Sequence, residues 1–199
     1  MIVSFLLVGE QPYARKMVES VKAVHGCKVV QMSDTKTQKV DGVDEIVRMP
    51  FRIPLMLYRL RHLAAYEHDE MLVLDTDVIC KKPVADVWRH PFDVALTKRD
   101  DEHAFGMPYN TGVMFSRNQI FFAECYNWLV GRDKEDLDWY GDQLAVAAVA
   151  KRGDYKVKTL TCEEFNWSPN SRADTSDARC WHYKGAKRKK WLKELCGFS

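Results

Sequence analysis

Short apolar runs alternate along the chain with longer segments of helical periodicity. Residues 2–8 form the first run and predict a buried strand, because a continuous stretch of β-branched and other apolar residues is typical of a strand covered on both faces. Residues 13–25 follow with apolar side chains at helical spacing, and Gly26 predicts the end of that helix. Strand patterns at 27–32 and 44–49 complete a strand–helix–strand–strand opening.

The remaining chain continues this alternation of strand and helix patterns. We predict strands at 71–74, 92–97, 112–116, 155–160 and 180–183, a capped turn or short helix at 81–88, and helices at 55–66, 118–130, 142–151 and 185–195. On the helix at 55–66 the leucines form the apolar face, and Arg59 and His62 lie off it. The pattern contains no repeat or linker, so it predicts one α/β domain over residues 1–199, with a mostly parallel central sheet flanked by helices.

Composition fits a globular protein and excludes other classes. The chain has 199 residues, of which 46% are hydrophobic and 29% charged, so it can bury a sizeable core. The run at 2–8 is too short for a membrane span and lacks the features of a signal peptide. Six scattered cysteines without metal-binding spacing indicate reduced thiols rather than a zinc site. We therefore expect no stable membrane insertion and a cytoplasmic location, in a bacterium or a virus-infected host.

Basic residues are concentrated toward the C-terminus. The net charge is only +2, but from Arg179 onward there are seven Lys or Arg residues against one Glu. This excess predicts an anionic ligand, such as the phosphates of a nucleotide, a nucleic-acid backbone or an acidic surface. A solvated basic helix face would explain the same pattern.

The strand pattern at 71–74 is stopped by Asp75, Thr76 and Asp77. Burying two unpaired carboxylates within a sheet is very costly, so they belong at the strand's end, where parallel sheets bind ligands. In an extended chain residues two apart face the same way, so both carboxylates can reach one cation, while Thr76 lends mainly its backbone. Oxygen ligands suit Mg²⁺ or Mn²⁺. A solvated polar turn is the alternative.

Four further segments occur with this acidic pair in a fixed order. They are Leu57-Tyr58-Arg59-Leu60, Tyr109-Asn110-Thr111-Gly112-Val113, Gly141-Asp142-Gln143 and His182-Tyr183-Lys184-Gly185-Ala186-Lys187-Arg188. Together with Leu72-Val73-Leu74-Asp75-Thr76-Asp77-Val78, they resemble the nucleotide-sugar glycosyltransferases of family 8, the group containing glycogenin and bacterial lipo-oligosaccharide galactosyltransferases. The resemblance covers nearly the whole chain and is weakest over 33–44, 98–107 and 161–179.

The resemblance implies a GT-A fold, which is Rossmann-like, and a divalent cation, Mn²⁺ or Mg²⁺. It implies transfer of sugar from a UDP-sugar donor to an acceptor hydroxyl with retention of anomeric configuration. By position, Asp75 and Asp77 become metal ligands, His182 becomes the third protein ligand, and Asp75 with Thr76 lies near the nucleotide. For His182 alone, an ordinary strand histidine is the alternative.

The same resemblance places residues at the nucleotide. Leu7 would offer its backbone to the base, and Tyr13 would meet the uracil ring. Gly185 belongs to the phosphate loop, where Arg188 takes the position of the family's diphosphate lysine and Lys187 is the second choice. Arg binds phosphate in bidentate fashion, which favours Arg188. A surface aromatic at a helix start is the alternative for Tyr13.

Further residues would surround the donor sugar. The resemblance places Arg59 against the sugar or phosphate, Asn110 and Gly112 in a turn that contacts sugar hydroxyls, and Asp142 and Gln143 below the ring, where they become candidate catalytic residues. Each has a structural alternative: an Arg that extends along an apolar helix, a plain Asn-x-Gly turn, and a helix N-cap at Asp142.

The acceptor and the reaction class stay open at this point. A glycan, a protein, a lipid-linked sugar or a modified nucleic-acid base could accept the sugar, with residues 98–107 and 165–179, near Trp167 and Trp181, as the candidate acceptor side. One alternative function is a nucleotidyltransferase, although the first strand lacks a Gly-rich phosphate loop. Another is a catalytically inactive module that binds glycans or nucleic acid.

Overall fold

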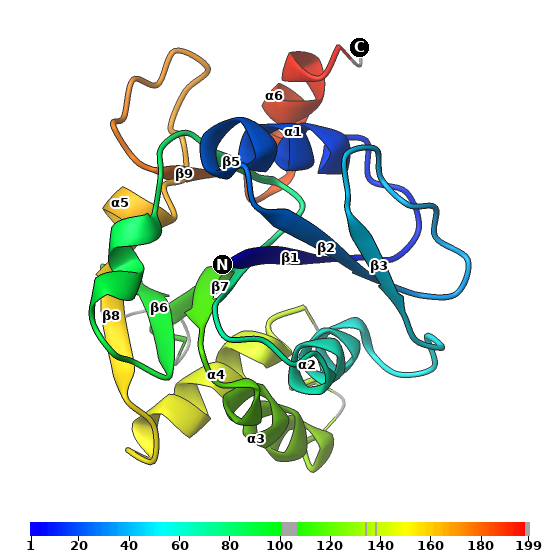
Figure 1. The fold of residues 1–199 in the computed structure, drawn as a ribbon, viewed down its shortest axis with the longest axis vertical. Helices are drawn as coiled ribbons and strands as arrows, with labels where there is room; N and C mark the ends of the chain where they lie inside the picture. Colours follow the sequence, from blue (N-terminus) through cyan, green and yellow to red (C-terminus); the bar gives the residue numbers. More distant parts are fainter. Residues whose placement is uncertain (101–106, 134, 138, 198–199) are drawn as a thin grey trace.

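A mixed sheet forms the centre of the computed structural model, which describes residues 1–100, 107–133, 135–137 and 139–197 (Figure 1). Within these residues seven strands form one sheet, and their spatial order is β3 (Glu45–Arg48), β2 (Lys28–Ser33), β1 (Ile2–Leu7), β4 (Met71–Leu74), β7 (Tyr109–Ser116), β6 (Val94–Lys98) and β8 (Val157–Thr161). The first four are mutually parallel, β7 is antiparallel to β4 and β6, and β8 is parallel to β6. The predicted α/β class with a mostly parallel sheet is confirmed.

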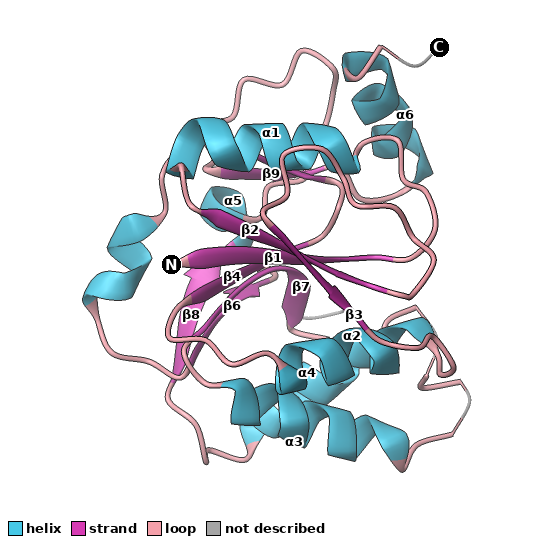
Figure 2. Ribbon diagram, turned by 45° about the vertical axis from the view of Figure 1, so that its right-hand side comes forward, coloured by secondary structure: helices cyan, strands magenta, loops and turns pink. Residues whose placement is uncertain are grey.

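Helices cover both faces of the sheet (Figure 2). On one side lie α1 (Ala14–His25), α6 (Ala186–Leu195) and a small second sheet, in which β5 (Val78–Cys80) pairs antiparallel with β9 (Cys180–His182). On the other side lie α2 (Leu55–Ala65), α3 (Gln119–Val130) and α4 (Gly141–Lys151). The short elements are the 3₁₀ helix η1 (Ala85–Arg89) and α5 (Cys162–Phe165). The strand predicted at 180–183 is confirmed as β9, whereas β5 and its pairing with β9 were not predicted, because a three-residue strand directly after a turn carries no periodic signal.

Two apolar layers hold these elements together. Leu72 and Leu74 belong to the layer under α1, whereas Met71 and Val73 belong to the layer under α2, α3 and α4. All four side chains of β4 are buried, as expected for a strand covered on both faces. Burial of each contributes about 1.5–3 kcal/mol, so the strand that leads into Asp75 is among the best-anchored parts of the fold.

The prediction that Arg59 and His62 lie on a polar face of α2 is wrong. Arg59 and His62 are only 6% and 0% exposed, because α2 is covered by the sheet on one side and by α3 and α4 on the other. His62 packs edge-on against Tyr58, with ring centroids 4.5 Å apart. The Tyr58 hydroxyl donates to the backbone carbonyl of Met49 at 2.6 Å. The carboxylates of Asp75 and Asp142 neutralise the guanidinium of Arg59.

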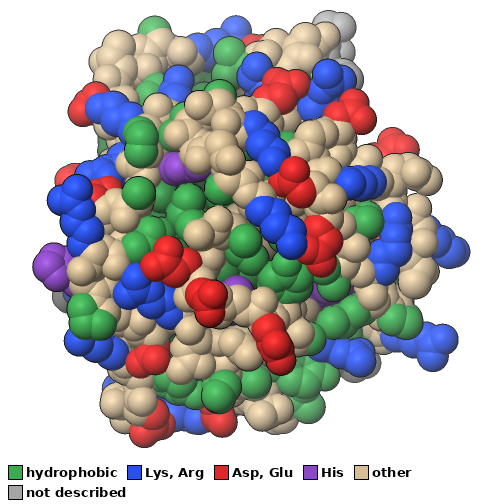
Figure 3. Space-filling view, viewed as in Figure 1, with side chains coloured by type: hydrophobic (Ala, Val, Ile, Leu, Met, Phe, Trp, Pro, Cys, Tyr) green, Lys and Arg blue, Asp and Glu red, His purple; other side chains and the backbone are tan. Residues whose placement is uncertain are grey.

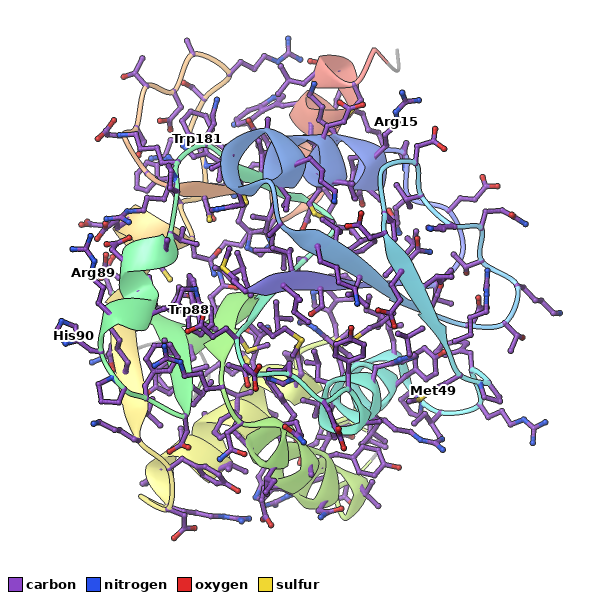
Figure 4. The ribbon with its side chains drawn as sticks, in the orientation of Figure 1. Arg15, Met49, Trp88, Arg89, His90 and Trp181 are labelled. Atoms are coloured by element: carbon purple, nitrogen blue, oxygen red, sulfur yellow. The ribbon has the colours of Figure 1, made fainter. Side chains whose placement is uncertain are left out.

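The surface carries charged side chains of both signs, interspersed over the face shown in Figure 3. Arg15 projects outward from α1 (Figure 4) and pairs with Glu19 at 3.0 Å. An exposed pair of this kind contributes about 0.2–1 kcal/mol. Among the described residues, no helix has the length and apolar character needed to cross a membrane.

Replacing His62 with Leu is expected to make the free energy of unfolding less sensitive to acid. Burial lowers the pKa of His62 from 6.5 to about 4. The unfolded chain therefore binds a proton at this position below pH 6.5, while the folded chain does so only near pH 4. Wild-type protein should lose stability as the pH falls through this window, by on the order of 3 kcal/mol, and H62L should lose less.

Urea unfolding at pH 7 and pH 4.5 measures this difference, with the exposed His90 replaced by Leu as the control. An equal loss of stability in wild type and H62L would contradict the assignment.

Candidate functional site

A cavity of about 730 Å³ opens beyond the carboxyl ends of β1 and β4. Its wall combines the end of β1, the segment after β4, and parts of α2, β7, α4, β9 and α6. Open α/β sheets bind ligands at this edge, because strand order reverses there and the chain leaves the sheet on both sides. The segments that the sequence analysis marked in five separate places therefore meet at one cavity.

Asp75 and Asp77 converge through a turn. Asp75 lies directly after β4 and its N–H donates to Gly112 O at 2.9 Å, and Val78 N–H donates back to Asp75 O at 3.2 Å. The expectation of an extended chain with both side chains on one face is therefore wrong in its geometry. The two carboxylates still lie together, because the tight turn folds Asp77 back beside Asp75.

His182 reaches this pair through the second sheet. In the pairing of β5 with β9, His182 lies opposite Val78, the residue after Asp77. Its Nε2 is 3.2 Å from Asp77 Oδ1 and 3.5 Å from Asp75 Oδ2. One ligand atom from each of the three residues lies within 4.8 Å of the other two. The three predicted metal ligands are thus brought together.

Each carboxylate has an outer and an inner oxygen. Asp75 Oδ1 pairs with Arg59 Nη2 at 2.8 Å, and Asp77 Oδ2 pairs with Lys189 Nζ at 3.2 Å. The remaining oxygens, Asp75 Oδ2 and Asp77 Oδ1, both face His182 Nε2. The basic side chains therefore hold the carboxylates from outside while the inner oxygens converge with the imidazole.

The chemistry of these donors fits a divalent cation. Burial would raise the pKa of Asp77, but His182 and Lys189 lower it to about 2, so this carboxyl group is ionised at neutral pH. Two carboxylates and one imidazole suit Mn²⁺, and Mg²⁺ would also accept the oxygen ligands. Asp75, Asp77 and His182 could therefore bind a metal ion.

Gly112 gives the imidazole its space. A Cβ on Gly112 would lie 2.2 Å from Cε1 of His182, a distance that no real contact allows. Gly112 and Asn110 lie within β7, beside a register shift between Leu96 and Thr97, and the predicted turn is absent there. Gly112 does not line the cavity and lies against the histidine ring, whereas Asn110, whose amide is predicted to contact sugar hydroxyls, does line it.

Asn110, a residue of the cavity wall, has an unused hydrogen-bond donor. It is 4% exposed, and its Oδ1 accepts from Gly112 N–H at 3.1 Å. Its buried Nδ2 has no hydrogen-bond partner among the described residues. A buried amide nitrogen without a partner is costly, and a ligand hydroxyl in the cavity would satisfy it.

Asp142 lies at the end of a buried charge network. Its Oδ2 is 2.6 Å from Arg59 Nη1 and accepts from Thr111 Oγ1 at 2.9 Å. Burial raises the pKa of Asp142, opposed by Arg59. The N-cap of α4 is Tyr140, so Asp142 does not serve as the cap, the alternative left open by the sequence. The neighbouring Gln143 lines the cavity and accepts from Arg99.

At the nucleotide end, the lysines in the cavity wall are Lys184 and Lys189. Leu7, Tyr13, Thr76 and Gly185 line the cavity as expected. Arg188 and Lys187, the predicted diphosphate residues, do not line it.

The helical spacing of α6 explains which of its basic side chains reach the cavity. Arg188 donates to Pro169 O at 2.6 Å, and Lys187 lies over the Trp191 ring at 5.3 Å. Lys189 lines the cavity because it is four residues after Gly185 and therefore on the same face of α6. That periodicity was readable in the sequence.

The predicted acceptor side is only partly present at the cavity. Trp181 lies on β9 near α1 (Figure 4) and is 8% exposed, and Trp167 packs against the same apolar cluster. Neither lines the cavity. Residues 101–106 of the predicted acceptor loop lie outside the described residues. Trp139, which the sequence analysis did not single out, is 67% exposed and lines the cavity.

Replacing Gly112 with Ala is expected to weaken Mn²⁺ binding by about tenfold or more, because the added methyl group must displace the His182 ring. Electron paramagnetic resonance of free Mn²⁺ measures the affinity. Gly131→Ala is the matched control, since a Cβ there meets nothing within 4 Å. Equal affinities of G112A and wild type would show that His182 is not a ligand.

Comparison with known proteins gives matches among solved structures. No protein-family model and no curated protein matches the sequence. The galactosyltransferase LgtC in complex with donor and acceptor sugar analogs matches with a TM-score of 0.66 and 17% identity, over 99% of this chain and 95% of that one. A glycosyltransferase involved in glycosylation of the major capsid of PBCV-1 matches with a TM-score of 0.67 and 17% identity, over 98% of each chain.

A third match extends the same comparison. The glycosyltransferase GlyE of Streptococcus pneumoniae TIGR4 gives a TM-score of 0.65 and 14% identity, over 100% of this chain and 60% of that one. Identities this low show the fold and leave the activity to be argued from the site. The chain has the GT-A glycosyltransferase fold, as the sequence predicted.

Proposed function

We propose that this chain is a metal-dependent glycosyltransferase that moves a sugar from a nucleotide-diphosphate sugar, a UDP-sugar, to an acceptor hydroxyl. The observation that carries the proposal is the convergence of Asp75, Asp77 and His182 at the cavity beyond β4. Its fold is shared with glycosyltransferases, and the LgtC structure holds donor and acceptor sugar analogs. The order of the motifs along the chain supports membership of family 8 and, with it, retention of anomeric configuration.

The metal and phosphate end of the site consists of the clustered carboxylates and the basic helix. Asp75, Asp77 and His182 would hold Mn²⁺ or Mg²⁺, which when bound neutralises the departing diphosphate. Lys189 already lies beside Asp77 and would add positive charge at the same phosphates. Gly185, with φ of 83°, is the N-cap of α6 and lines the cavity, so backbone N–H groups at this helix start would be available to a phosphate.

The base would lie between the end of β1 and α6. Leu7 and Tyr13 are both 4% exposed and form one wall of the cavity. Lys189 Nζ is 5.9 Å from the centroid of the Tyr13 ring, so the nucleotide end and the phosphate end are adjacent. A planar pyrimidine fits beside an aromatic wall of this kind.

The donor sugar would be held on the opposite side of the metal ligands. Asn110 Nδ2 supplies a donor for a sugar hydroxyl, and Arg59 fixes Asp142 and Asp75 in place around the ring. Gln143 lies beside Asp142 in the wall, where its amide oxygen would stabilise positive charge on the sugar. One of the matched LgtC structures is an active-site mutant in which a glutamine is replaced by glutamate.

The reaction follows from this arrangement. The bond between the anomeric carbon and the leaving phosphate oxygen breaks as positive charge develops on the sugar. The acceptor hydroxyl forms the new bond from the same face, and its proton passes to the leaving phosphate oxygen. Asp142 and Gln143 stabilise the cationic sugar from below, so no separate general base is required. The acceptor would be a glycan, a protein, a lipid-linked sugar or a modified nucleic-acid base.

Replacing Asp77 with Asn is expected to remove the contribution of Mn²⁺ to UDP binding, because it deletes one charge of the cation site. Calorimetry with UDP, with and without Mn²⁺, should show affinity rising by about tenfold or more with the metal in wild type but not in D77N. The exposed Asp154→Asn is the control and should behave as wild type.

Mass spectrometry with a panel of nucleotide sugars, scoring hydrolysis and transfer, tests the activity itself. UDP binding that does not depend on Mn²⁺ would contradict the proposal. A preference for nucleoside triphosphates over UDP would also contradict it and would favour a nucleotidyltransferase. Absence of nucleotide binding would indicate a module without this activity.

A further inference from the structure

Asn166 contacts His182 from the side opposite the carboxylates. It directly follows α5, is 2% exposed and does not line the cavity. Its Oδ1 is 2.8 Å from His182 Nδ1. Its Nδ2 donates to Thr97 Oγ1 at 2.8 Å and to Asn110 O at 3.2 Å. No motif marks this residue, which falls in the stretch where the family resemblance is weakest.

The partners of Asn166 determine which way its amide points. The Thr97 hydroxyl donates its only hydrogen to a backbone carbonyl, Asn110 O at 2.7 Å, so Thr97 Oγ1 can only accept from Asn166. The carbonyl of Asn110 can also only accept. Both groups on this side therefore require the NH₂ of Asn166, which turns Oδ1 toward His182.

The direction of the amide determines the tautomer of the imidazole. Oδ1 accepts and cannot donate, so His182 Nδ1 must carry a hydrogen. Nε2 is then the ring nitrogen that faces Asp75 Oδ2 and Asp77 Oδ1, and a cation bound between these groups would take up its lone pair. Deleting the acceptor would leave a buried N–H unsatisfied, which favours the other tautomer with its hydrogen on Nε2.

The surrounding contacts fix the ring as well as its tautomer. His182 N–H donates to Trp167 O at 2.6 Å, so the segment after α5 holds both the backbone and the side chain of His182. Gly112 lies so close to the ring that a Cβ at this position would clash with it. These contacts therefore restrict rotation and displacement of the imidazole ring and leave Nε2 directed at the carboxylates.

We propose that Asn166 is a positioning residue that fixes the Nδ1–H tautomer of His182 and presents Nε2 to the cation. Asn166 touches neither the cavity nor the carboxylates and acts only through His182. The proposal rests on the metal site of the proposed function and does not depend on sugar transfer. Partners of this kind, behind a metal-binding histidine, change metal affinity by about 10–100-fold.

Two variants separate this role from a packing role. Asn166→Leu removes every polar contact of the side chain, whereas Asn166→Asp removes the Nδ2 donor but keeps an oxygen acceptor for Nδ1–H. We expect N166L to weaken Mn²⁺ binding by about 10–100-fold and N166D to remain close to wild type. A residue needed only for packing would make both variants equally weak, or N166D weaker because of its buried charge.

Long-range ¹H–¹⁵N spectra of histidine-labelled protein with Mg²⁺ provide a direct readout of the tautomer. The His182 signals, assigned by their loss in H182Q, should show hydrogen on Nδ1 in wild type and N166D but not in N166L. Asn118→Leu is the control for general destabilisation, since it removes the cap of α3, where Asn118 Oδ1 accepts from Ile120 N–H. N118L should keep wild-type Mn²⁺ affinity.

Equal Mn²⁺ affinities of N166L and N166D, hydrogen on Nε2 in wild type, or no Mn²⁺ binding by wild type would overturn the proposal. None of these measurements uses a sugar donor. Wild type that binds Mn²⁺ with the expected tautomer but transfers no sugar would contradict the proposed function and leave the role of Asn166 intact.

Discussion

The antiparallel pairing of β5 with β9 is the contact on which the site depends. It joins a strand that begins one residue after Asp77 to a strand that ends at His182, more than a hundred residues later in the chain. The pairing is anchored from α1, where Ser20 Oγ accepts from Cys80 N–H at 3.0 Å. This pairing brings His182, and the helix α6 that follows it, beside the acidic pair.

The buried charges of the site support one another. Arg59 is shared between Asp75 and Asp142, so a single guanidinium links the metal ligands to the region proposed for the donor sugar. Lys189 of α6 forms an ion pair with Asp77. Removing one member of the buried Arg59–Asp142 pair costs about 3–5 kcal/mol, because its partner is left uncompensated. The network therefore fixes the directions of the carboxylate oxygens as well as the protonation of Asp77.

Local sequence patterns predicted the elements that bury large apolar faces. The apolar run before Asp75 placed the acidic pair at a strand end, and the spacing of α1 and the cap at Gly26 were also predictable. Burial of Arg59 was not, because it depends on carboxylates from other elements. The pairing of β5 with β9 and the contact of Asn166 with His182 join residues far apart in the sequence, so no local pattern predicts them. The turn at Asp75 is local, but the strand pattern predicted an extended chain there. Family analogy suggested Arg188 for the diphosphate, whereas counting one helical turn from Gly185 would have given Lys189 as a side chain in the cavity wall.

The central claim is that one cation binds between Asp75, Asp77 and His182 and contacts the diphosphate of a nucleotide. Crystals grown with Mn²⁺ and UDP, measured for anomalous scattering of manganese, test it most directly. The account predicts a manganese peak bonded to both carboxylates, to Nε2 of His182 and to the phosphates, with the base beside Tyr13. UDP bound in the cavity with no manganese peak at these residues, or manganese bound elsewhere, would contradict it.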